Sequence, residues 1–124
     1  MAQGYTGVAD YITEKVSPET NTSTSYASDA SEYGVFRAIA NNNFTLANPT
    51  GASDGQKLLW RITQDGTGSR TITLDTKFRV ASDINSGVVT LSTGANVRDY
   101  LGAVYDADDD KFDVIAFTKG ITTV

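Results

Sequence analysis

The 124-residue sequence contains no cysteine and no histidine. Without cysteine the chain can form no disulfide, no thiolate metal site and no cysteine nucleophile. Without histidine it lacks the side chain that most often acts as a general base near neutral pH. Stability must therefore come from packing within the chain or against other chains.

Blocks of basic residues and long apolar runs are also missing. The net charge is −5, with 10 basic against 15 acidic residues, whereas binding to nucleic acid requires a basic face that neutralises phosphates. No run approaches the roughly 18 apolar residues of a membrane span. The first ten residues also lack the charged and then apolar regions of a secretory signal. We therefore expect synthesis in the cytoplasm, and neither nucleic acid nor a membrane as a partner.

What the sequence does contain, from Tyr33 onward, is a series of short alternating segments separated by turn residues. About eight such segments follow one another at spacings of roughly 8–12 residues, with no helical pattern between them. Predicted strands include residues 33–40, 44–46, 88–91, 98–105 and 111–117, and the first and last of these carry apolar residues on both faces. No internal repeat of about 20–50 residues is evident. This pattern predicts an all-β fold in which residues 33–124 form an antiparallel β-sandwich with a jelly-roll-like body.

The clearest pattern lies in residues 54–74. Leu58, Trp60 and Ile62 alternate with more polar positions, and a second alternating run follows the glycine-rich loop of residues 65–69. Two alternating runs around such a loop predict a β-hairpin. A phosphate-binding loop would open a helix instead, so the glycines are better explained as residues that supply positive φ angles.

The N-terminal stretch, residues 1–32, differs in composition from the rest. It has five acidic residues against one lysine, and its Ser/Thr-rich tract over residues 17–31 contains no large aliphatic side chain. Such a tract buries too little apolar surface to order itself. We predict an extended arm over residues 1–32, with a short helix near residues 8–16.

Apolar anchors are spaced along this arm, and each could enter a separate pocket. The arm could be an unstructured terminus, but this spacing favours one that becomes ordered on a neighbouring subunit or partner. The predicted partner-binding anchors are Tyr5, Val8, Tyr11, Ile12 and Val16.

Candidate catalytic and metal sites are weak. The acidic run of residues 106–110 begins like a calcium loop, but Lys111 stands where an EF-hand needs glycine and Phe117 where it needs glutamate. No glutamate follows Glu32, and the aspartates of the body sit mostly in turns, where Asp bends the backbone. We predict no enzymatic activity, no metal and no cofactor.

The aromatic residues within the strand patterns are best explained as packing residues, since large rings dominate cores and interfaces. An exposed subset could instead stack against carbohydrate. The residues concerned are Tyr33, Trp60, Tyr100 and Tyr105.

Residues 48–56 and 61–74, followed by 91–96, 99–101 and 111–117, resemble a recurrent β domain of tailed-bacteriophage virion proteins. The resemblance extends over residues 44–120 and does not include the arm. This domain occurs in capsid decoration (cement) proteins and as a module of tail fibres. The resemblance implies a jelly-roll-like sandwich, usually a homotrimer, with an interaction role and no catalytic residues.

A single module with a tether suits a protein that sits on a lattice and reaches its neighbours. We therefore expect a capsid decoration protein, located on the capsid surface of the virion. It would bind the major capsid protein as a homotrimer and stabilise contacts between capsomers through many weak contacts, with its arm on a neighbouring subunit. The alternative is a tail-fibre or receptor-binding module that holds host surface polysaccharide, and a glycan-cleaving β-sandwich enzyme is a third possibility.

Overall fold

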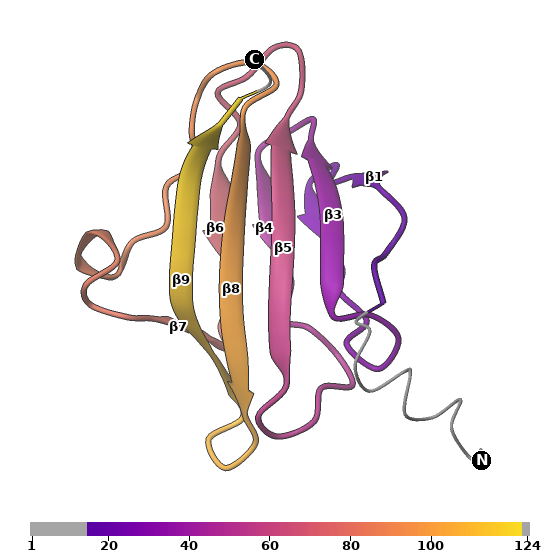
Figure 1. Cartoon of the computed structure of the whole chain (residues 1–124), viewed down its shortest axis with the longest axis vertical. Helices are drawn as coiled ribbons and strands as arrows, with labels where there is room; N and C mark the ends of the chain where they lie inside the picture. The colour runs from indigo at the N-terminus through magenta and orange to yellow at the C-terminus, as the bar shows by residue number, and fades with distance from the viewer. Residues whose placement is uncertain (1–14, 123–124) are drawn as a thin grey trace.

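The computed structural model describes residues 15–122 and is built almost entirely of β-strands in two sheets (Figure 1). Within this range the only helical element is a short 3-10 turn, η1 (Asn85–Gly87), and no helix is long and apolar enough to cross a bilayer. The six-stranded sheet runs β1 (Thr20–Asn21), β3 (Val35–Ala40), β5 (Lys57–Gln64), β8 (Arg98–Asp106), β9 (Lys111–Ile121), β7 (Phe78–Val80). The three-stranded sheet runs β2 (Ser25–Tyr26), β4 (Phe44–Leu46), β6 (Ile72–Leu74). The prediction of an all-β fold is confirmed.

The first six strands alternate between the two sheets, so the chain winds around the core as in a short parallel β-solenoid. β1, β3 and β5 are parallel neighbours in one sheet, and β2, β4 and β6 are parallel neighbours in the other. Thr20 pairs with Ala38, whereas Val35 pairs with Leu59. We call each passage of the chain through both sheets a coil. Successive coils differ in length, which explains why no fixed repeat is visible in the sequence.

This winding corrects the predicted antiparallel pairing. Only β5 with β8, and β8 with β9, are antiparallel, while the other strand pairs of the described residues are parallel. The hairpin predicted for residues 54–74 is also wrong, because β5 and β6 belong to different sheets. Alternation identifies a strand without identifying its partner, and the loop between Gln64 and Ile72 is long enough to cross from one sheet to the other.

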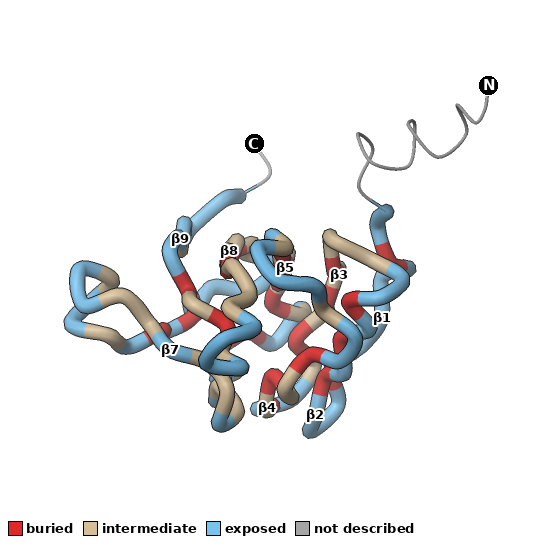
Figure 2. The backbone as a smooth tube through the Cα atoms, turned by 90° about the horizontal axis from the view of Figure 1, so that it is seen from below, coloured by how far each residue is buried: buried red, intermediate tan, exposed pale blue. Residues whose placement is uncertain are grey.

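The core lies between the two sheets, where the buried residues of both layers meet (Figure 2). From the six-stranded sheet Phe36, Trp60 and Phe112 point inward, and Phe44 and Leu46 do so from the three-stranded sheet. Within the six-stranded sheet a continuous chain of ring contacts runs from Phe36 to Trp60, Phe78 and Phe112, and Trp60 stacks on Phe36 at 5.6 Å between centroids. The indole Nε1 of Trp60 also donates a 2.8 Å hydrogen bond to Ser28 Oγ.

Residues 15–32 take part in the sheets and in the core. Lys15 O accepts hydrogen bonds from Gly34 N and Val35 N at the start of β3. Strands β1 and β2 both belong to this stretch. Thr22, Tyr26 and Ser28 are buried. Small polar side chains can be buried here because neighbouring coils supply hydrogen-bond partners. Residues 1–14 lie outside the described residues, so the extended arm stays a prediction there, as does the predicted helix near residues 8–16 up to residue 14. Val16 is not helical and forms a bridge with Val35.

A strandless segment, residues 88–97, closes one end of the core. Val89 and Leu91 are buried, although the predicted strand at residues 88–91 does not form. Two buried polar side chains hold the segment in place: Gln64 Nε2 donates to Ser92 O at 2.9 Å, and the Asp99 carboxylate accepts from both the backbone N and the Oγ of Ser92 at 2.7 Å. Hydrogen bonds from side chains here replace those of a strand ladder.

Replacing Trp60 with alanine should destabilise the fold strongly, because the variant loses a fully buried ring and leaves a cavity. We expect the free energy of unfolding to fall by about 3–5 kcal/mol, measured by guanidinium denaturation with circular dichroism detection. Val88→Ala is the control, since Val88 is 55% exposed and should change stability by no more than about 0.5 kcal/mol. A loss below about 1 kcal/mol at Trp60 would contradict the described core.

The loop of residues 65–69 offers a matched pair of glycine substitutions. Gly68 has φ +76°, and a Cβ there would lie 2.5 Å from Thr93 O, whereas a Cβ at Gly66 would meet open space. We expect Gly68→Ala to cost at least about 1–2 kcal/mol, the penalty of the left-handed region for a residue with a Cβ. Gly66→Ala should be within about 0.5 kcal/mol of the wild type. Equal effects of the two substitutions in thermal denaturation would show that the loop conformation is different.

Candidate binding surface on the outer face of the six-stranded sheet

The outer face is defined here as the side of β3, β5, β8 and β9 that points away from the three-stranded sheet. Strand alternation places every second residue on it, and none of its residues on β3 or β5 is buried. Because neighbouring strands are in register, these residues line up in rows across the sheet.

One of these rows is apolar and exposed. We call it the apolar row; it is aligned by the pairings of Val16 with Val35, Val35 with Leu59, Leu59 with Gly102, and Gly102 with Ala116. A register shift between Gly102 and Ala103 adds Ile115 beside it. Ile115 is 61% exposed and Val16 50% exposed. A sheet face turned to solvent normally carries polar residues, so this row is unusual.

A groove opens along the row, with a cavity volume of about 270 Å³. Residues 57–59 of β5, 102–104 of β8 and 115–116 of β9 line it. Gly102 leaves this space open: a Cβ at this position would lie 3.5 Å from Ala116 Cβ and 4.0 Å from Leu59 Cδ1, in ordinary contact. Lys57 adds a positive charge to the apolar lining.

The next rows along the strands carry arginines. Arg37 pairs with Arg61 and Arg61 with Tyr100, while Arg98 lies one row further, opposite Thr63. We use the name arginine row for these two adjacent rows together; its members are Arg37, Arg61, Arg98 and Tyr100. With a net charge of −5 for the whole chain, this concentration of guanidinium groups makes the outer face locally positive.

Few of these charges are neutralised. Arg61 forms an ion pair with Glu19, with 3.0 Å between Nη2 and Oε2. Arg37 Nε donates to a backbone carbonyl at 2.8 Å, and Arg98 Nε donates to Thr63 Oγ1 at 3.2 Å. Among the described residues, neither Arg37 nor Arg98 has a carboxylate within 4.0 Å. Their remaining N–H groups can therefore meet an anionic group from outside.

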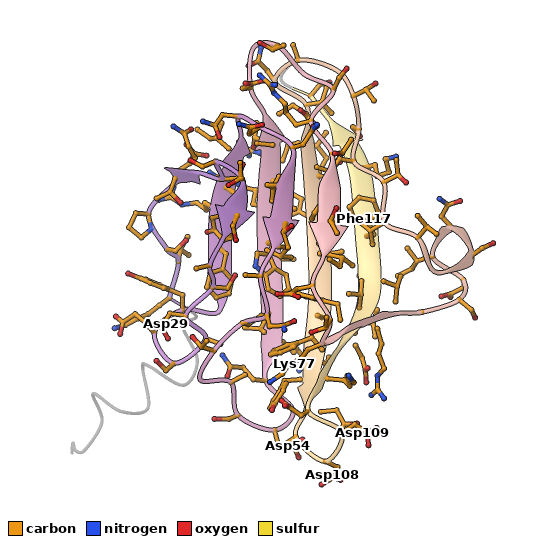
Figure 3. The ribbon with its side chains drawn as sticks, turned by 180° about the vertical axis from the view of Figure 1, so that it is seen from behind. Asp29, Asp54, Lys77, Asp108, Asp109 and Phe117 are labelled. Carbon is orange, nitrogen blue, oxygen red and sulfur yellow. The ribbon has the colours of Figure 1, made fainter. Side chains whose placement is uncertain are left out.

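Most carboxylates of the acidic turn between β8 and β9 are, by contrast, ion-paired within the chain. Figure 3 shows Asp54, Asp108 and Asp109 at one end of the molecule, with Lys77 beside them. Arg79 forms ion pairs with three aspartates, and Lys77 Nζ lies 2.7 Å from Asp110 Oδ2. In the part of the chain that the structure describes, no group of three or more His, Cys, Asp or Glu side chains could hold a metal ion.

Two titrations are shifted at this turn. Lys77, and then the hydroxyl of Tyr105, hydrogen-bond to Asp110 and lower the pKa of its carboxyl below the ordinary 3.8. The same contact raises the pKa of Tyr105 above 10.0, because the phenol donates a 2.7 Å hydrogen bond to the Asp110 carboxylate. These groups are exposed, and their partners hold the turn in place.

With the geometry known, the comparison with protein families becomes informative. Residues 20–97 match a family described as "Putative phage tail fibre C-terminal domain". The match extends over well over half of the chain, from β1 through β7. The chain belongs to this family. No curated protein and no solved structure matches it.

Membership of the phage tail fibre C-terminal domain family confirms the resemblance to phage virion domains and identifies the chain as a structural component of the virion. The family description names a tail fibre, so it agrees better with the alternative prediction than with a capsid decoration protein. The matched residues end before β8, so they provide only the β5 wall of the groove.

The predicted partner-binding residues are only partly placed. Tyr5, Val8, Tyr11 and Ile12 lie outside the described residues, whereas Val16 lies at one end of the apolar row. The groove and the arginine row were not predicted. One sequence feature pointed to an apolar outer face: the segments at residues 33–40 and 111–117 carry apolar residues on both faces. Only the strand order shows that the outward residues of the two segments lie on the same surface.

Removing Lys77 should raise the pKa of Asp110. We expect Lys77→Met to move the pKa of this carboxyl up towards 3.8, as followed by NMR titration of the side-chain carbon. Because the pKa is lowered by folding, the interaction stabilises the fold above pH 3.8 and is lost as the pH falls through the folded value. Lys119→Met is the charge-matched control. An unchanged Asp110 titration in Lys77→Met would show that the contact is absent in solution.

Proposed function

We propose that this chain is a non-enzymatic module of a phage tail fibre that holds anionic host surface polysaccharide on the outer face of its six-stranded sheet. The observation that carries the proposal is the arginine row, a set of incompletely neutralised guanidinium groups beside an aromatic ring on an otherwise acidic chain. The family description, which names a tail fibre, supports the same assignment.

The chemistry of the arginine row suits charged sugars. A guanidinium group presents several N–H donors in a planar fork that matches the oxygens of carboxylates and phosphates. The half-buried ring of Tyr100 lies next to Arg61 on the neighbouring strand and can pack against the apolar face of a sugar ring. Rows on a regular sheet also repeat their spacing, which suits a repeating polymer.

A structural role without catalysis agrees with the sequence. With no histidine and no cysteine in the chain, the common nucleophile and base pairs cannot be formed. Three aspartates of the β8–β9 turn form ion pairs with Arg79 or Lys77, namely Asp106, Asp109 and Asp110. Homotrimer formation and capsid decoration stay predictions. The matching family is described as a domain of a tail fibre, so the short length of this chain does not by itself favour a free-standing capsid protein.

The proposal is tested by measuring binding of the purified chain to acidic and neutral bacterial surface polysaccharides. We expect binding to the acidic polymers that weakens as salt is added. Arg37→Gln and Arg98→Gln should each weaken it roughly tenfold to a hundredfold, as expected when a charge-assisted hydrogen bond of about 1.5–3 kcal/mol is lost. Lys111→Gln, the same change of charge at the other end of the β8–β9 pair, opposite Asp106, should have little effect.

Two outcomes would contradict the proposal. Equal affinity for neutral and acidic polymers would exclude the arginine row as the binding site. Saturable binding to undecorated phage capsids, without binding to any polysaccharide, would instead support the capsid decoration protein.

A further inference from the structure

The groove on the outer face needs an occupant different from the ligand of the arginine row. Its walls are apolar, and Ile115 at its edge is 61% exposed. Leu59 and Val104 add further apolar surface within it. Contiguous exposed apolar surface of this kind is typical of an interaction site.

The residues that precede the described chain have matching chemistry. Residues 1–14, MAQGYTGVADYITE, contain the apolar side chains of Tyr5, Val8, Tyr11 and Ile12. They also contain Asp10 and Glu14 and no lysine or arginine. The groove is apolar with Lys57 in its wall, and the arginine row borders it, so both the apolar and the acidic character of the segment are complemented.

The place where this segment joins the body limits its reach within one chain. Gly34 N and Val35 N donate to Lys15 O at 3.0 and 3.1 Å, and Ser17 N donates to Val35 O at 2.8 Å. Lys15–Ser17 therefore runs along β3, on the side away from the groove. The walls of the groove, on β5, β8 and β9, lie two to four strands further, at roughly 10–19 Å for a strand spacing of about 4.8 Å.

Tyr11 and Ile12 are too close to this attachment point to reach across the groove of their own chain to Ile115 on β9. Four residues reach at most about 14 Å, and only when fully extended. The backbone at Lys15 runs along the strand instead of across the sheet, so a reversal of direction would use up part of that length. Tyr5 and Val8 are far enough from Lys15 to reach the groove of either copy. Only in a second copy can all four anchors lie along the groove together.

We propose that residues 1–14 of one copy dock in the outer-face groove of a second copy. Each copy has one such segment and one such groove, so the exchange can continue around a closed ring of identical chains. The apolar anchors cover the apolar row, and the carboxylates lie in the positive field of Lys57 and the arginine row. This contact does not depend on polysaccharide binding.

The absence of cysteine allows a direct test on the full chain. A variant with Val8→Cys and Ile115→Cys is oxidised and examined by non-reducing electrophoresis. We expect covalent dimers and higher multiples, at least tenfold more than in a matched variant with Val8→Cys and Val88→Cys, since Val88 is a similarly exposed residue outside the groove. An internal disulfide within single chains, or equal cross-linking in both variants, would overturn the exchange between copies.

A second measurement does not depend on cross-linking. Ile115→Glu should weaken self-association of the full chain at least tenfold in sedimentation equilibrium, whereas Val88→Glu should leave it unchanged. Ile115 is exposed, so the substitution should not unfold the chain, which circular dichroism can verify. A mass that is the same in both variants would overturn the proposal. Polysaccharide affinity measured on the same proteins separates this result from failure of the proposed function.

Discussion

The packing of Trp60 holds together parts of the chain that are far apart in the sequence. Its ring stacks on Phe36 of β3, meets Phe78 of β7 at 5.7 Å and donates a hydrogen bond to Ser28 in the first coil. The tryptophan lies on β5, in the middle of the winding. An indole N–H is costly to bury without an acceptor, and here the acceptor is Ser28 Oγ of the first coil. The first coil must therefore be in place before this core is complete.

The same winding determines what is left for function. Inward positions of β3 and β5 are used by the core, and outward positions are left on a sheet face that the described residues do not cover. Register then collects apolar residues into one row and arginines into the next. Two chemically different surfaces thus lie side by side, one suited to a peptide segment and one to anionic groups. At the turn between β8 and β9, by contrast, most carboxylates already form ion pairs with Arg79 or Lys77, so this acidic cluster is a weaker candidate for a binding site.

The sequence analysis was most successful where contacts are local. It predicted strands at residues 33–40, 44–46, 98–105 and 111–117, and the antiparallel pair of β8 and β9 follows from the short turn between them. It was wrong about residues 54–74, since β5 and β6 lie in different sheets. The tract over residues 17–31 looked too polar to pack, yet Thr22 and Ser28 are buried because Asn41 and Trp60, from later parts of the chain, supply partners for their hydroxyl groups. Of the candidate site, the sequence analysis named two described residues, Val16 as an anchor of the arm and Tyr100 as a ring that could stack against carbohydrate.

By itself the sequence determines which residues of a strand share a face. The alternation of Leu58, Trp60 and Ile62 with Leu59, Arg61 and Thr63 separates core from surface before any partner is known. Only the tertiary structure decides which strands become neighbours, because parallel pairing depends on loops of variable length and on contacts between distant residues. The apolar row and the arginine row exist only in that arrangement. Their members are contributed by four different strands and a preceding segment, and no local pattern links them.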